Sequence, residues 1–285
     1  MSVEQPASSA SGAAWGSDAA AAGWRNAAAA RGQALAPVTE AMLHLAGVRE
    51  GSRVLDVGAG TGDQTVEAAQ RVGPNGSVLA TDISSAMLEH AGEAIRAAGL
   101  SNVEWRVMDA QQLDLESGSF DAAIARFSLQ FVPDVQRALG EIRRVLRPGG
   151  RFAAVVFSSV EKNLFRSEPQ AIASRLLGRR FPEPGPGQWA LNEPGILREA
   201  FERARFEEVD ARTVPFVYRF PSLSEARQNL EGTQPLLVKL LGELNEEQRE
   251  AAWAEIEQVL RPYEGPNGFE IDNEALVAVG ARGRG

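Results

Sequence analysis

Hydrophobic positions follow two alternating patterns up to about residue 160: short apolar runs, and longer segments with apolar residues at helical spacing. The runs typical of buried strands lie at 53–57, 77–82, 102–109, 120–127 and 151–157. Between two of them, Ser84 can cap a helix whose apolar face includes Leu88 and Ile95. Such alternation is typical of βαβ units, so we expect an α/β fold with a parallel sheet covered by helices on both faces.

The pattern changes beyond residue 160. A helix candidate within 161–190 runs into a Pro/Gly-rich loop, and a return helix at 195–206 leads into a further strand at 206–220. We expect two helices within 222–262. The alternating segment 269–282 then predicts a closing strand.

These patterns divide the chain into three parts. We expect a flexible N-terminal arm or lid over 1–34 and a ligand-binding α/β core over 35–160. The third part, 161–285, completes the sheet and adds cap helices at about 161–190 and 222–262.

The amino-acid composition narrows the classes of function that the chain can have. The 285 residues include no cysteine, which excludes disulfides, thiolate metal sites and cysteine nucleophiles, and two histidines argue against a multi-histidine metal centre. A net charge of -9 disfavours an electrostatic hold on nucleic acid or anionic lipid. No stretch approaches the roughly 20 apolar residues that span a bilayer, and the N-terminus makes a poor signal peptide. We therefore expect a cytoplasmic enzyme for small molecules, with no membrane insertion and no bound metal.

The segment 54–63, Val-Leu-Asp-Val-Gly-Ala-Gly-Thr-Gly-Asp, carries the clearest chemical signal. Its alternate glycines follow a strand, where they allow a tight turn and let backbone N–H groups approach a ligand closely. Asp82 ends the next strand, 82 − 62 = 20 residues beyond the last glycine, a spacing that suits a carboxylate bound to ribose hydroxyls. NAD and S-adenosylmethionine both fit this geometry.

Asp63 distinguishes between these two candidate ligands. The dinucleotide fingerprint places its third glycine one residue later and seats a pyrophosphate at the helix N-terminus. A carboxylate at Asp63 would compete for the N–H groups and positive dipole that a pyrophosphate needs. Asp56 adds negative charge where an ammonium or sulfonium group would be stabilised. The loop therefore favours a nucleoside without phosphates, although a purely structural glycine turn remains an alternative.

Beyond the loop, further segments resemble the motifs of class I S-adenosylmethionine-dependent methyltransferases. The matching segments are VLDVGAGTG (54–62), LATDIS (79–84), MDAQQL (108–113), FDAAIARFSLQFVPD (120–134) and LRPGGRF (146–152). The resemblance covers about 40–160 and is closest to the small-molecule methyltransferases that include the ubiquinone/menaquinone biosynthesis enzymes. It implies a Rossmann-like three-layer sandwich with a mostly parallel seven-stranded sheet, an antiparallel last strand and helical cap insertions.

The resemblance also implies a set of contacts with S-adenosylmethionine. The cofactor-binding positions are Asp56, Gly58, Gly60, Gly62, Asp82, Ile83, Met87, Asp109, Ala110, Arg126 and Phe127. The glycines would pack on the methionine and ribose, and Asp56 would orient the loop and the amino group. Asp82 would hold both ribose hydroxyls, with Ile83 on the adenine face and Asp109 and Ala110 at the adenine edge. Arg126 and Phe127, with Ser128, would line the methionine end, while Met87 has an alternative place in the core.

A sulfonium methyl donor is already a strong electrophile, so an enzyme of this family can act mainly by positioning the acceptor, an effect of up to about 7 to 11 kcal/mol. We find no convincing general base, and the catalytic residues stay unassigned. The candidates for the acceptor side are Trp24, Gln130, Phe131, Arg166, Trp189 and Tyr218, whereas Phe157 and Phe216 are expected to fill the core. Arg126 or Arg166 can meet a carboxylate or phosphate of the acceptor.

The expected reaction is methylation of a small, partly apolar or aromatic metabolite on oxygen or carbon. Two alternatives stay open at this point. One is a protein of the same fold that binds S-adenosylmethionine without transferring its methyl group. The other is an NAD-type oxidoreductase, against which Asp63 and the shortened glycine spacing argue.

Overall fold

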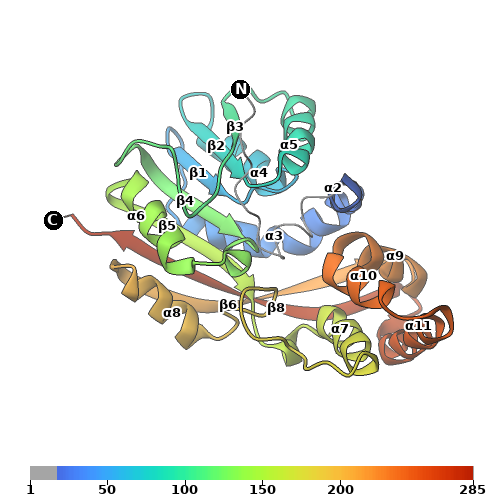
Figure 1. The fold of residues 1–285 in the computed structure, drawn as a ribbon. Coiled ribbons are helices and arrows are strands. Elements are labelled where there is room, and N and C mark those ends of the chain that lie inside the picture. The colour runs from blue at the N-terminus through green and yellow to red at the C-terminus, as the bar shows by residue number, and fades with distance from the viewer. Residues whose placement is uncertain (1–17, 285) are drawn as a thin grey trace, which may run out of the picture.

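A computed structural model describes residues 18–284, and one twisted sheet forms its centre (Figure 1). The strands are β1 (Arg53–Val57), β2 (Ser77–Asp82), β3 (Val103–Val107), β4 (Phe120–Arg126), β5 (Leu146–Phe157), β6 (Phe206–Phe220), β7 (Glu264–Gly265) and β8 (Gly268–Arg282). Their order is β3-β2-β1-β4-β5-β8-β6, and β7 pairs only with β8. Strands β1 to β5 are parallel, whereas β8 is antiparallel to both β5 and β6. The Rossmann-like sheet with an antiparallel last strand is confirmed, with the two-residue β7 as an eighth strand.

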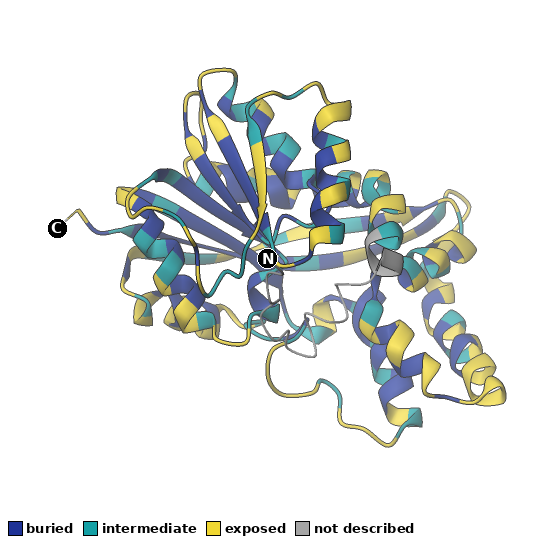
Figure 2. Ribbon diagram, turned by 45° about the horizontal axis from the view of Figure 1, so that its top comes forward, coloured by how far each residue is buried: buried dark blue, intermediate teal, exposed yellow. Residues whose placement is uncertain are grey.

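Helices cover both faces of this sheet. The helices over the core are α3 (Ala28–Leu45), α4 (Asp63–Val72), α5 (Ser85–Ala97), α6 (Val135–Val145) and α8 (Pro194–Arg203). Successive strand residues point to opposite faces, so Val54 and Ile124 pack in the cluster that includes α3 and α4. Their neighbours Leu55 and Ala123 pack in the cluster that includes α6 and α8. The central strands are buried along nearly their whole length (Figure 2), which explains why their sequences are unbroken apolar runs.

The remaining helices form a cap at the far ends of the long strands β6 and β8 (Figure 1). The cap helices are α7 (Leu164–Leu176), α9 (Leu223–Thr233), α10 (Pro235–Gly242) and α11 (Glu246–Leu260), and the short helices are η1 (Leu129–Phe131), η2 (Val160–Lys162) and η3 (Arg261–Tyr263). The segment 222–262 thus holds three main helices where two were expected, because Pro235 starts α10 directly after α9. Within residues 18–284, no helix has both the length and the apolar content that a bilayer crossing requires.

The N-terminal segment is helical wherever the structure describes it. Helix α2 (Asp18–Asn26) leads into α3, which runs without a break through the boundary expected at residue 34. Residues 1–17 of the expected arm lie outside the described residues. Helix α2 contacts α5 and α9, and at α9 the backbones meet so closely that a Cβ on Gly23 would lie 2.3 Å from the carbonyl oxygen of Gly232. The helix is thereby held over the carboxyl ends of the strands.

Candidate cofactor and acceptor site

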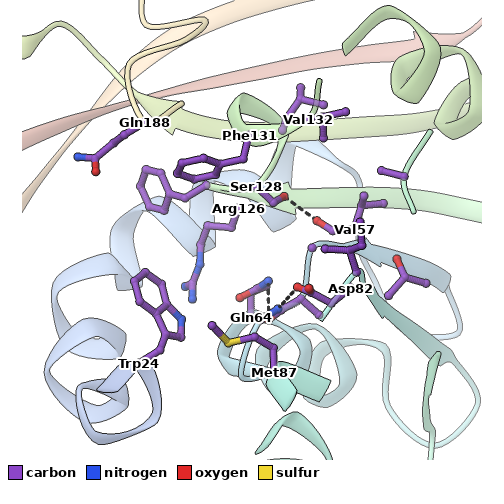
Figure 3. Close-up of a pocket in the computed structure, with 18 of the residues that line it drawn as sticks. Trp24, Val57, Gln64, Asp82, Met87, Arg126, Ser128, Phe131, Val132 and Gln188 are labelled. Carbon is purple, nitrogen blue, oxygen red and sulfur yellow. Dashed lines mark hydrogen bonds between the residues drawn. The ribbon is translucent and has the colours of Figure 1, made fainter. Parts of the chain in front are cut away.

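A pocket lies at the carboxyl ends of β1, β2 and β4 (Figure 3). Strands β1 and β4 are neighbours in the sheet, but α4 follows β1 on one face and α6 follows β4 on the other. This reversal opens a crevice between the two connections, the place where open α/β sheets bind ligands. Residues of α2, α3 and α7 and of the loop after α7 complete the walls.

The glycine loop after β1 is pressed against its neighbours. Gly58 has φ +71°, and a Cβ there would lie 2.3 Å from Cβ of Ser128. Gly62 has φ +87° and caps α4, where a Cβ would lie 3.0 Å from Cβ of Ala91 on α5. Only glycine fits these two positions, for both steric and conformational reasons. Gly58 and Gly60 line the pocket, whereas Gly62 lies behind it and sets the start of the helix.

Asp82 lies in the pocket at the end of β2. Its two carboxylate oxygens accept the backbone N–H groups of Gly60 and Ser84, each at 2.9 Å. Enclosure by protein raises the pKa of Asp82, and the N–H donors oppose this shift. The carboxylate therefore ties the glycine loop to the start of α5 while facing the pocket. Beside it, Ile83 is 41% exposed at the rim, and the largely buried Met87 forms part of the wall.

Asp56 lies behind the pocket rather than in it. It is fully buried and accepts the Thr65 hydroxyl at 2.6 Å and the Gln64 side-chain amide at 3.2 Å. Gln64 also donates to the backbone carbonyl of Ala59, so Asp56 acts on the loop through α4. Desolvation raises the pKa of Asp56 to about 6, against the effect of its two hydrogen bonds. Gln64, which the sequence reasoning missed, lines the pocket in its place.

Asp63 differs from expectation in its partners. Rather than binding the N–H groups at the start of α4, its carboxylate accepts Nε of Arg31 at 2.7 Å and lies 3.4 Å from a terminal nitrogen of Arg126. Arg31 also donates to the backbone carbonyl of Trp24 at 2.6 Å and to the Thr61 hydroxyl at 3.0 Å. Arg31 and Arg126 are both buried, and both line the pocket. Arg31 thus links the N-terminal helices to the glycine loop by hydrogen bonds, and no local sequence motif predicts this role.

The opposite wall holds Asp109 and Ala110, which follow β3. Asp109 accepts the backbone N–H of Gln111 at 2.8 Å and the side-chain amide of Gln111 at 3.0 Å. Asp109 therefore closes a turn, the structural role that competes with the proposed adenine contact, and still lines the pocket. Gln111 lines the pocket as well and was missed, although it belongs to the matching segment 108–113.

Aromatic rings form the other end of the pocket. Phe127 has φ +55° and stacks on Phe157 with ring centroids 4.2 Å apart. Phe157 is buried as expected, but it also lines the pocket, so the expectation that it only fills the core is wrong. Phe216 is buried and does not line it, as expected. Left-handed backbone at a bulky residue is costly, and here it turns Phe127 into the pocket wall.

The acceptor-side candidates divide into two groups. Trp24, Phe131 and Arg166 line the pocket; Gln130, Trp189 and Tyr218 do not. Gln130 is fully buried in η1, Trp189 donates its indole N–H to Gln170 at 3.0 Å, and Tyr218 packs among the aromatic rings of the core. Gln188, one residue before Trp189, reaches the pocket instead.

A sheet of this order, with its pocket beside β1 and β4, is the fold of class I S-adenosylmethionine-dependent methyltransferases, and the chain belongs to that family. Residues 38–179, about half of the chain, match the ubiE/COQ5 methyltransferase family in particular. The ubiquinone/menaquinone biosynthesis C-methyltransferase UbiE of Teredinibacter turnerae is 40% identical over 123 residues, which cover 43% of this chain and 49% of the relative. The chain thus spans about half the length of the curated relatives it matches.

Solved structures share the fold over more of the chain. YcgJ of Bacillus subtilis has a TM-score of 0.56 at 19% identity, covering 87% of this chain and 98% of that one. Phosphoethanolamine N-methyltransferase 2 of Haemonchus contortus, in complex with phosphomonomethylethanolamine and S-adenosylhomocysteine, has a TM-score of 0.53 at 20% identity. It covers 85% of this chain and 52% of that one. The shared fold therefore extends into the C-terminal part of the chain, beyond residue 179, where the family match ends.

Proposed function

We propose that this chain transfers a methyl group from S-adenosylmethionine to oxygen or carbon of a small, partly apolar or aromatic metabolite. One observation carries the proposal: a single pocket joins an acidic end, at Asp82 and Asp109, to an aromatic end at Phe127, Phe131 and Phe157. Carboxylates suit the hydroxyl and amino groups of a nucleoside. Stacked rings suit an apolar, planar acceptor.

At the acidic end, Asp82 would bind the ribose hydroxyls, with Ile83 against the adenine ring. Asp109 and the backbone of Ala110 would bind the adenine edge. At the methionine end, Gly58 and Gly60 leave room for close backbone contact, and Arg126 and Phe127 line the wall beside them. Asp56 and Gly62 would act from behind the pocket, by holding the loop and the start of α4 in place.

When bound, S-adenosylmethionine supplies a methyl group on a positively charged sulfur. The residues of this chain would hold the acceptor in line with that group, as positioning alone can lower a barrier by about 7 to 11 kcal/mol. Among the described lining residues there is no histidine, and both lining carboxyls already accept backbone N–H groups. The acceptor would therefore bring an acidic proton of its own, released to water, rather than lose it to a base of the protein.

The N-terminal helices would exclude water from the site. Trp24 lies over Gly60, with its indole nitrogen 3.6 Å from where a Cβ would be. The Arg31 guanidinium lies 4.3 Å from the Trp24 ring centroid and hydrogen-bonds the glycine loop beneath it. The net charge of -9 further supports a small-molecule acceptor over nucleic acid.

The first test measures binding of S-adenosylmethionine by calorimetry. We expect Asp82→Ala to weaken binding by about 1 to 3 kcal/mol through the lost charge-assisted hydrogen bonds, whereas Asp114→Ala, at an exposed position, has no effect. An unchanged dissociation constant would remove Asp82 from the site. Binding of a nicotinamide dinucleotide in place of S-adenosylmethionine would refute the cofactor assignment.

The second test follows transfer itself. Incubation with label in the donor methyl group and a metabolite extract should yield a labelled small molecule and an equal amount of S-adenosylhomocysteine. Tight donor binding with no labelled product would favour a non-methylating binder of the same fold. Label found only in tRNA or protein would contradict a small acceptor.

A further inference from the structure

Arg166 on α7 is a buried cation without a charged partner. Arg166 is 4% exposed and lines the aromatic end of the pocket. One terminal nitrogen donates to the Tyr218 hydroxyl at 3.2 Å, but Nε has no hydrogen-bond acceptor within residues 18–284. No carboxylate of the described chain forms an ion pair with it. A buried guanidinium in this state is costly unless something else supplies the missing acceptor.

The surroundings of Arg166 compensate for only part of this cost. Its guanidinium carbon lies 5.2 Å from the centroid of the Phe157 ring and 5.7 Å from that of Tyr218, so both ring faces stabilise the positive charge. Neither ring offers an in-plane acceptor for Nε. The unmet demand is therefore for an oxygen, and a negatively charged oxygen satisfies a guanidinium best.

Gln188 presents a second unpaired donor on the same pocket. It is 7% exposed, and its side-chain oxygen accepts the amide of Gln170 at 3.1 Å, which turns its Nε2 into a donor without an acceptor. Figure 3 shows Gln188 beside Phe131, at the end of the pocket away from Asp82. Two residues that line the pocket thus each carry a buried donor nitrogen with no acceptor within residues 18–284.

We propose that Arg166 and Gln188 bind an anionic oxygen group, a carboxylate or a phosphate, carried by a planar aromatic acceptor. This inference rests on the proposed function, since it places the acceptor at the aromatic end. The ring of the acceptor lies against the Phe127 and Phe157 stack, and its anionic group pairs with the Arg166 guanidinium. A neutral analogue leaves the buried charge unpaired and is rejected. Arg166 is then the residue that selects the acceptor class, not a residue of the transfer step.

The test uses matched probes on protein saturated with S-adenosylhomocysteine, whose own affinity is measured first. The probes are 6-hydroxy-2-naphthoate, its carboxamide, and 2-naphthyl phosphate. We expect one of the two anions to bind at least about tenfold more tightly than the neutral carboxamide. Whichever anion shows this preference identifies the group as a carboxylate or a phosphate.

Variants assign the preference to the proposed residues. Arg166→Met should remove the preference, and Arg166→Lys should keep part of it because the charge remains. Gln188→Leu should weaken anion binding less than Arg166→Met does. The control is Arg175→Met on the same helix, where the arginine is exposed and paired with Glu255, and it should bind like the wild type. All variants should keep the affinity for S-adenosylhomocysteine, which also shows that they are folded.

Equal binding of the three probes to the wild type, or no binding of either anion, would overturn the proposal. So would a preference that survives in Arg166→Met or disappears equally in Arg175→Met. These results are separate from failure of the proposed function, because that failure appears earlier, as a protein that does not bind S-adenosylhomocysteine at all.

Discussion

Asp56→Asn should change how the stability of the protein depends on pH. The wild-type carboxyl is fully buried, and desolvation raises its pKa from 3.8 to about 6. Because the folded-state pKa lies above the unfolded one, the folded state binds the proton more tightly between these two values. The resulting stabilisation is fully present below the unfolded pKa and is lost as the pH rises through about 6. Asparagine keeps the shape of the side chain without this titration.

The size of the effect follows from the two pKa values. Between about pH 4.5 and about pH 7.5, a shift from 3.8 to about 6 changes the free energy of unfolding by roughly 2 kcal/mol. The wild type should thus gain about 2 kcal/mol over Asp56→Asn at the lower pH relative to the higher one. Every other carboxyl is shared by the two proteins, so its own pH dependence cancels in the comparison.

Urea unfolding followed by circular dichroism at both pH values measures this difference. Asp114→Asn, which removes an exposed carboxyl, serves as the control for loss of one acidic group. If wild type and Asp56→Asn keep the same stability difference at both pH values, burial does not set the titration of Asp56. A difference of opposite sign would mean that the charged form is favoured inside the fold.

Three further substitutions test other parts of the site. Gly58→Ala places a Cβ 2.3 Å from Ser128, whereas Gly51 has a similar φ and open space around it. In thermal unfolding, Gly58→Ala should therefore destabilise the fold by about 1 to 3 kcal/mol more than Gly51→Ala does. Arg31→Met removes the hydrogen bonds between α3 and the glycine loop and should speed release of S-adenosylhomocysteine at least about tenfold in stopped-flow measurements; an unchanged rate would contradict the covering role. Phe157→Leu should raise KM for the acceptor and leave cofactor affinity intact, as steady-state kinetics and calorimetry can show.

The core strands could be predicted from the sequence because burial on both faces leaves a strong local signal. The bounds of β1 and β2 agree with the apolar runs at 53–57 and 77–82. Helix α5 starts after Ser84, whose hydroxyl accepts the backbone N–H of Met87 and caps the helix as expected. The three helices of 222–262 were harder to separate, because α9 carries few apolar residues and no loop divides it from α10.

The two ends of the pocket differ in how far the sequence reveals them. The acidic end is built by short loops directly after strands, so a local motif places Gly58, Gly60, Asp82 and Asp109 in the pocket. The acceptor end is built from residues of α2, α7 and the long loop after α7. In these segments the sequence pattern does not show which of two adjacent residues faces the pocket. Trp189 faces the core while the preceding residue reaches the pocket.

The contact between Gly23 and Gly232 has a mechanical consequence. With no side chain between the two backbones, α2 cannot move toward α9 without displacing it. Helix α2 carries Trp24 above the glycine loop, and α9 belongs to the cap at the ends of β6 and β8. A movement of α2 toward the cap would therefore be transmitted to α9, so the cover over the glycine loop and the cap helices are mechanically coupled through this contact.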